Sequence, residues 1–182
     1  MSTDIVDKQM KKLRNARWNK AFDMDKNSDH VDKNPRDDVN RKATIVIEHI
    51  VQASDISHTM QHWHVYRKWN QKLFEELYVA YLNDRMDKNP VEFWYQGEFG
   101  FFDFYIIPLT EKLKNCGVFG VSSGEFLDFA RKNRAEWENQ GEDVVKEMYE
   151  ECIKKYGTKD SKQEQAPLAE QHRSRNHTDD IC

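Results

Sequence analysis

Residues 65–82 constrain the fold more than any other segment, because their apolar side chains repeat with the period of an α-helix. One row of these side chains recurs every four residues, and a second row lies beside it: Val65, Trp69, Leu73, Leu77 and Tyr81, then Tyr66, Phe74, Tyr78 and Leu82. A stripe this broad has to be buried against neighbouring helices. The segment therefore predicts a core helix in a helical protein.

The rest of the chain shows the same helical periodicity and no convincing strand. Helices are predicted up to residue 22 and over residues 41–53, 91–115 and 122–156. Short oxygen side chains at Ser2, Thr3 and Asp4 are suited to capping the first of them. Pro108 should kink the third helix, because it lacks a backbone N–H and its ring clashes with the preceding turn. We expect an all-α fold, a helical bundle.

Two polar stretches lack this periodicity. Residues 23–40 are rich in Asp, Asn and Lys and are predicted to be a flexible loop, and residues 157–182 are predicted to be a disordered polar tail. The remaining residues, 1–156, have the length of a single domain.

Composition narrows the class of protein. Charged residues make up 33% of the chain and hydrophobic residues 38%, with a formal net charge of −4. The sequence pI of about 6.0 argues against binding a nucleic-acid polymer. The three scattered cysteines indicate a reducing compartment. The chain shows no signal peptide and no membrane segment, so we expect a cytoplasmic protein, with a membrane-anchored parent protein still possible.

Asp55, His58 and His62 suggest metal chemistry. On one continuous helix these residues would share a side, and carboxylate and imidazole groups are ligands for zinc and other divalent metals. In the alternative interpretation, Asp55 ends one helix or caps the next, and the histidines lie on a polar surface. The spacing alone leaves both interpretations open and favours the second.

Residues 96–103 suggest a site for a flat ring. On a helix, Glu98, Phe101 and Phe102 share a face, and an acid beside an aromatic wall can hold a heterocycle by edge hydrogen bonds and stacking. The alternative is that these phenylalanines belong to the core. That alternative is favoured by this stretch alone.

Taken in order, these elements resemble the C-terminal half of the catalytic domain of class I 3′,5′-cyclic nucleotide phosphodiesterases. The family's A-D-L-S-N followed by Y-R-x-W is similar to residues 54–58 and 66–69. Its Q-V-G-F-I-D-Y-I-V-x-P-L resembles residues 98–109, its A-T-D-M resembles residues 2–5, and its late N-R-x-W is similar to residues 133–137. The resemblance covers about residues 1–150.

The resemblance implies an HD-type helical domain that hydrolyses cAMP or cGMP to the 5′-monophosphate in signal transduction, using zinc together with magnesium or manganese. By motif position, Asp55 would be a zinc ligand. Phe101 and Leu73 would be the two jaws of a clamp on the base. Glu98 would replace a base-reading Gln, and His58 would replace the family's Asn.

The chain departs from the family pattern because the H-N-x-x-H and H-D elements, which lie upstream of A-T-D-M in the family, do not occur in it. We therefore expect a truncated chain that is inactive alone, with the general acid and the other metal ligands upstream. A parent protein would carry regulatory or cyclase domains. The predicted helices over 41–54 and 65–82 should also expose apolar surface that the missing half would cover. A catalytically dead helical remnant, acting as an interaction or nucleotide-binding module, is the alternative.

Overall fold

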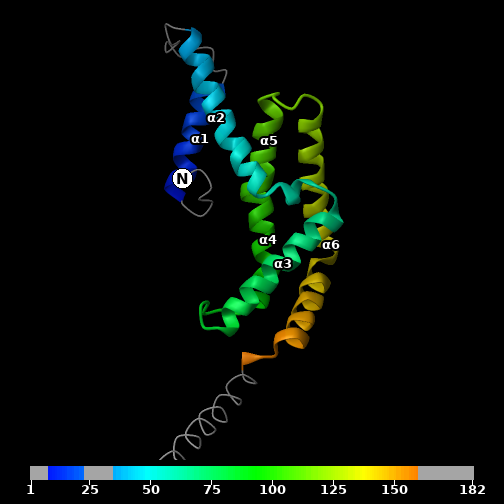
Figure 1. Ribbon diagram of the computed structural model, residues 1–182. Coiled ribbons are helices and arrows are strands. Elements are labelled where there is room, and N and C mark those ends of the chain that lie inside the picture. The colour runs from blue at the N-terminus through cyan, green and yellow to red at the C-terminus, as the bar shows by residue number, and fades with distance from the viewer. Residues whose placement is uncertain (1–7, 23–34, 160–182) are drawn as a thin grey trace, which may run out of the picture. The chain divides into compact units, whose positions relative to one another are not determined.

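The computed structural model describes residues 8–22 and 35–159, and these residues fold as helices joined by turns (Figure 1). No strand occurs in the described ranges, which agrees with the all-α prediction. None of the helices in this part of the chain combines the length and the apolar run that crossing a bilayer requires. The described residues form two compact units: residues 8–22, 35–66 and 100–135 in the first, and residues 67–99 and 136–159 in the second.

The order of the helical elements follows the sequence prediction closely. The elements are α1 (Lys8–Phe22), α2 (Pro35–Asp55), the 3₁₀ turn η1 (Ser57–Met60), α3 (Trp63–Leu82), the 3₁₀ turn η2 (Pro90–Glu92), α4 (Trp94–Phe101), the π-helix η3 (Phe102–Ile106), α5 (Ile107–Asn115) and α6 (Ser122–Tyr156). The predicted helix ends at residues 22, 82, 115 and 156 are confirmed. The predicted cap at Ser2–Asp4 lies outside the described residues.

Helix α2 begins earlier than predicted, at Pro35, so residues 35–40 are helical and do not continue the predicted loop. A proline fits the first position of a helix because the N–H that it lacks has no partner there. Acids in the first turn are stabilised by the helix dipole, and one of them, Asp38, also pairs with Arg41 at 2.6 Å. Residues 23–34 of the predicted loop lie outside the described residues.

The predicted long helix over 91–115 is interrupted by the π-helix η3. Pro108 has no N–H to give to the carbonyl of Phe104, four residues earlier, and the wider π-turn makes room for its ring. The carbonyl oxygen of Phe104 instead accepts a hydrogen bond from Lys11 Nζ at 2.8 Å. The kink that Pro108 predicts is therefore a π-turn placed before the proline.

The core of the first unit lies where α1 packs on α2, and α2 packs in turn on α5 (Figure 1). Trp18 and Ala21 of α1 are buried against Ile45 of α2. The Trp18 ring stacks on Phe22, with centroids 4.4 Å apart, and lies 4.6 Å from the ring of His49.

The core of the second unit is aromatic. Phe74 of α3 is fully buried and meets the ring of Trp94 edge-on at 5.3 Å. The indole Nε1 of Trp94 donates to Asn70 Oδ1 at 3.1 Å, and that of the fully buried Trp137 donates to the carbonyl of Tyr95 at 3.1 Å. The buried polar atoms of these indoles are therefore satisfied within the unit.

Within the second unit, α3 runs beside the last part of α6. Surface contacts join the two helices at a constant difference of 80 in residue number. The pairs are Arg67 with Glu147, Gln71 with Glu151 and Glu75 with Lys155. Gly157 ends α6 with a φ of 76°, which favours glycine, and its carbonyl accepts from the Tyr78 hydroxyl at 2.8 Å. Because surface ion pairs add little stability, the edge-on contact of the buried Tyr78 ring with Tyr149, with centroids 5.7 Å apart, contributes more to holding this pair of helices together.

Candidate functional site

Asp55 is the last residue of α2, and its side chain is exposed. The C-terminal end of a helix carries a partial negative charge, which disfavours a carboxylate there by about 0.3–1 kcal/mol. No basic residue in the last turn of α2 offsets this cost. The position of Asp55 is therefore not explained by helix stability, and a nearby cation would stabilise it.

The continuous helix on which Asp55, His58 and His62 were expected to share a side does not exist. The α-helix stops at Asp55, and η1 follows as a 3₁₀ turn. Gln61 is then extended, with φ −121° and ψ −177°, before α3 begins at Trp63. The interpretation with a shared helical side therefore fails, since it assumed one period across two breaks, and Asp55 ends a helix as the favoured alternative stated.

Asn133 holds this turn in place. Its side chain is 1% exposed, and its amide Nδ2 donates to the carbonyls of Thr59 at 2.9 Å and Gln61 at 2.8 Å. The next residue, Arg134, pairs with Asp103 at 3.1 Å. The element that starts at Asn133 is therefore structural.

The histidines around the turn differ in exposure. His58 is half-buried, and burial lowers the pKa of its imidazole, so the ring is neutral at pH 7 and offers one donor and one acceptor. His62 and His64 are exposed, with ring centroids 5.8 Å apart, and the rings of His62 and Phe129 meet edge to face with centroids 4.6 Å apart. His62 and His64 therefore lie on the surface, as the alternative interpretation predicted.

The described residues lack the clustered donor groups of a metal centre. Nowhere in residues 8–22 and 35–159 do three or more His, Cys, Asp or Glu side chains lie together so that they could hold a metal ion. A catalytic zinc takes about three protein ligands. The described residues alone therefore do not fit a catalytic zinc site, and Asp55 would be a single ligand within one.

The aromatic stretch divides between core and open surface. Phe102 is fully buried and meets the ring of Tyr66 edge-on at 5.3 Å. Phe101 is half-buried, and its ring stacks on Tyr105 with centroids 5.6 Å apart and planes 8° apart. Phe104 is 69% exposed. The core interpretation holds for Phe102, whereas Phe101 keeps open ring surface.

Glu98 and Leu73 belong to the second unit, and Asp55, His58 and Phe101 belong to the first. Glu98 is only 9% exposed, on α4. Leu73 on α3 is 48% exposed. The exposure of both residues is unusual for their type, because carboxylates are rarely buried and leucines are commonly buried.

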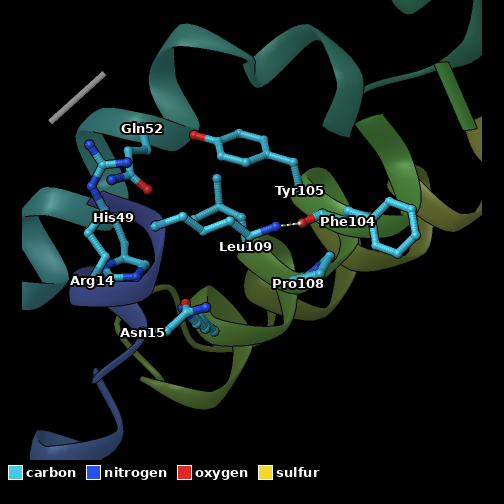
Figure 2. Close-up of a pocket in the computed structure, with 10 residues that line it drawn as sticks. Arg14, Asn15, His49, Gln52, Phe104, Tyr105, Pro108 and Leu109 are labelled. Carbon is cyan, nitrogen blue, oxygen red and sulfur yellow. Dashed lines mark hydrogen bonds between the residues drawn. The ribbon is translucent and has the colours of Figure 1, made fainter. Parts of the chain in front are cut away.

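Sequence reasoning missed a polar cavity within the first unit, of about 60 Å³, bounded by α1, α2, η3 and α5 (Figure 2). Arg14, His49 and Gln52 line it and are all largely buried. A signal was present in the sequence, because His49 and Gln52 are polar residues three apart on the buried side of an apolar helix. The cavity that they line forms only when α1 and α5 pack against α2.

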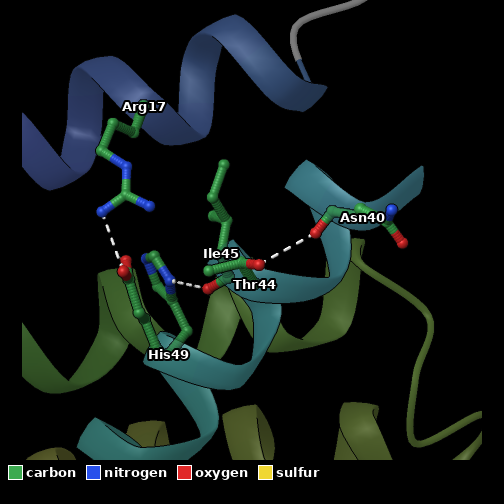
Figure 3. Close-up of polar contacts among 6 residues, drawn as sticks. Arg17, Asn40, Thr44, Ile45 and His49 are labelled. Carbon is green, nitrogen blue, oxygen red and sulfur yellow. Dashed lines mark hydrogen bonds and ion pairs between the residues drawn. The ribbon is translucent and has the colours of Figure 1, made fainter. Parts of the chain in front are cut away.

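His49 is fixed in this cavity by its own helix (Figure 3). Its Nδ1 lies 2.8 Å from the carbonyl oxygen of Ile45, and because a carbonyl only accepts, Nδ1 carries the proton. The neighbouring Glu48 pairs with Arg17 of α1 at 2.8 Å. The imidazole therefore has a defined orientation and, in the neutral ring, an Nε2 that accepts.

Comparison with known proteins agrees with the motif order. The family model described as 3′5′-cyclic nucleotide phosphodiesterase matches residues 2–118, which contain Asp55, Leu73, Glu98 and Phe101. The match ends before Asn133 and so covers less of the chain than the motifs suggested. No curated protein and no solved structure matches the chain. The family match spans more than half of the chain, and the protein therefore belongs to the 3′5′-cyclic nucleotide phosphodiesterase family, a family of hydrolases.

Proposed function

We propose that this chain is part of a catalytic domain that hydrolyses 3′,5′-cyclic nucleotides to 5′-monophosphates. The observation that carries the proposal is the family match over residues 2–118. In this reaction water adds across the bond between phosphorus and O3′, and O3′ leaves with a proton. Because the H-N-x-x-H and H-D elements of the family do not occur in the sequence, we assign Asp55 as one ligand and place the general acid and the other ligands upstream.

The outer face of α2 supports this assignment. Ile47 and Val51 are 59% and 39% exposed, and Asp55 follows them at the same four-residue spacing. These three side chains therefore share one face of the helix. An exposed apolar stripe of this kind is typical of a surface that another protein segment covers. A segment packed there would bring its own side chains to the carboxylate of Asp55.

We further propose that Glu98 reads the base, and that Phe101, Leu73 and His58 have the substrate-binding roles that the family resemblance implies. An ionised Glu98 only accepts hydrogen bonds, and guanine offers the N1–H and N2–H donors that match it. A protonated Glu98 would imitate glutamine and lose this preference. The proposal therefore ties the choice between cAMP and cGMP to the protonation of one buried carboxyl group.

The same exposed stripe also supports a second candidate function. A non-catalytic helical module would use Ile47 and Val51 to pair with the helix of another protein or would bind nucleotide without hydrolysing it. In the first candidate, the segment that covers Ile47 and Val51 brings metal ligands to Asp55. In the second candidate, it does not.

The decisive experiment starts from the genomic sequence upstream of the Met1 codon. If it encodes H-N-x-x-H and H-D in frame, the extended chain is expressed and its kcat/KM for cAMP and cGMP is measured. Asp55→Asn should lower kcat/KM by about 100-fold or more, since even residues that only orient metal ligands contribute about 10–100-fold. Asp128→Asn, at an exposed acid on α6, should leave it unchanged.

Three outcomes decide between the candidates. Unrelated DNA upstream of Met1 would favour the non-catalytic module. Equal activity of the Asp55 and Asp128 variants would remove Asp55 from the metal site. The 182-residue chain itself is expected to show no hydrolysis above a mock purification, and activity that scales with its concentration would contradict the truncated-domain proposal.

Base recognition is tested separately in the extended chain. Glu98→Gln should shift the ratio of kcat/KM for cAMP over cGMP toward cAMP, because the amide can donate to the adenine edge. An unchanged ratio would show that Glu98 does not read the base, while leaving the hydrolysis proposal intact.

A further inference from the structure

We propose that the cavity bounded by α1, α2, η3 and α5 binds a small oxyanion, specifically a phosphate group (Figure 2). Its volume of about 60 Å³ is larger than a single water molecule requires and too small for a nucleoside. The cavity lies within the first unit, and its lining contains none of the residues proposed for the metal or the base. The inference therefore does not depend on the proposed function.

The charges around the cavity favour an anion. Lys11 and Arg14 reach it from α1 and Lys112 from α5, and none of the described residues that line it is acidic. Burial lowers the pKa of the Lys112 ammonium, and the positive charge of Lys11 lowers it further. The ammonium of Lys112, which is partly desolvated and repelled by Lys11, gains stability when an anion enters beside it.

Two buried donors in the same cavity have no hydrogen-bond partner. Gln52 is only 4% exposed, and its Nε2 amide has no hydrogen-bond partner. The buried hydroxyl of Tyr105 has none either. Figure 2 shows the hydroxyl end of Tyr105 turned toward the side of the cavity where Gln52 lies. Buried polar groups in native proteins nearly always have a partner. Two unpaired donors beside three cations point to a ligand that accepts hydrogen bonds and carries negative charge.

His49 reports on the charge in the cavity. Burial lowers the pKa of its imidazole, while the hydrogen bond to Ile45 raises it. The positive charges of Lys112 on α5 and Arg14 on α1 lower the pKa further, and Glu48 on its own helix raises it. An anion held among these cations would offset them, so binding should raise the pKa of His49.

The test uses the 182-residue chain, with inorganic phosphate as the probe and chloride at equal ionic strength as the reference. We expect phosphate to raise both the thermal midpoint and the pKa of His49, measured by NMR of the imidazole. Lys11→Gln should weaken phosphate binding about tenfold, the effect of losing one charge-assisted contact. Lys12→Gln is the matched control, because Lys12 is the next exposed lysine on α1 and does not line the cavity.

A second variant keeps the test decisive if Lys11→Gln is poorly folded. Gln52→Met replaces the unpaired amide by an apolar side chain of similar length, so it should fold and yet bind phosphate more weakly. Equal effects of phosphate and chloride on the wild-type chain would overturn the proposal, and so would equal phosphate binding by the Lys11 and Lys12 variants. The 5′-monophosphate AMP distinguishes the source of the phosphate group. Equal shifts of the thermal midpoint and of the His49 pKa by AMP and by inorganic phosphate would support recognition of the phosphate group alone. Shifts caused by AMP but not by inorganic phosphate would overturn the proposal.

Discussion

The two units treat buried polar groups differently. In the second unit, Trp94, Trp137 and Tyr78 each give their N–H or O–H to an acceptor within the unit. In the first unit, Gln52 and Tyr105 keep buried donors without a partner beside a cavity. A polar group that is satisfied inside a core adds specificity to packing, whereas an unsatisfied one costs stability. The comparison indicates that these three groups of the second unit serve packing, and that the cavity of the first unit has room for a ligand.

The largest expected effect tests the packed unit. Trp137→Ala removes a fully buried indole and its hydrogen bond to the carbonyl of Tyr95, so the free energy of unfolding should fall by about 3–5 kcal/mol. Trp69→Ala is the control, because Trp69 is 50% exposed. Urea unfolding measures both variants. Equal losses would mean that Trp137 is not a core residue of the second unit.

The next effect tests the first unit away from its cavity. Asn133→Leu keeps the size of the side chain but leaves the carbonyls of Thr59 and Gln61 without their donor, and we expect a loss of about 2 kcal/mol in the free energy of unfolding. Asn139→Leu, on the exposed side of the same helix, should change it little. If Asn133→Leu were neutral, the turn between α2 and α3 would not depend on this anchor.

Two glycines of α6 give a smaller effect with opposite signs. A Cβ at position 141 would lie 2.9 Å from ring atoms of Trp137 and 3.0 Å from Tyr95, whereas one at position 124 would meet nothing within 4 Å. Gly141→Ala should therefore lower the free energy of unfolding by about 1–2 kcal/mol through overpacking. Gly124→Ala should raise it by about 0.5 kcal/mol, because alanine favours the helix. Thermal unfolding of both variants checks the signs, and a stable Gly141→Ala would mean that the rings move aside freely.

The smallest effect concerns pH and the cavity. Burial and the nearby cations lower the pKa of His49, so the unfolded chain binds its proton more tightly than the folded chain does. Stability from this group is therefore present above the ordinary imidazole pKa of about 6.5 and is lost as the pH falls below it. His49→Gln should flatten the dependence of the thermal midpoint on pH between 7.5 and 5, roughly the range in which an imidazole titrates. His64→Gln, at an exposed histidine of α3, should leave the dependence unchanged.

Local chemistry allowed most of the fold to be predicted, and the misses have tertiary causes. The predicted helix ends at residues 115 and 156 are confirmed, and Gly117 and Gly157 follow them with a positive φ. Pro35 looked like part of a loop because its surroundings are polar, although the same proline is suited to the first position of a helix. The break after Asp55 is stabilised by Asn133, which lies 74 residues from Thr59 in the chain, and helical periodicity contains no information about such a contact.

The candidate site was less accessible from the sequence than the fold. Motif order was sufficient to predict the family, because the spacing of Asp55, Glu98 and Phe101 is a local property of the chain. The cavity was not predictable, because Lys11 and Lys112 come from distant segments and each looks like an ordinary surface lysine. Burial of Glu98 was also unforeseen, since a carboxylate on a helix is usually exposed.

The π-turn before Pro108 makes this part of the chain sensitive to its length. A π-turn holds one residue more than an α-turn, and each residue of a helix rotates its successors by about 100°. Deleting one residue from 102–106 would let regular helical bonding resume with little net rotation of the buried Leu109 and Leu113, because the wider turn already absorbs the extra residue, but it would remove the room that this turn gives to the ring of Pro108. Substitutions in the turn should consequently be tolerated through evolution far more often than insertions or deletions there.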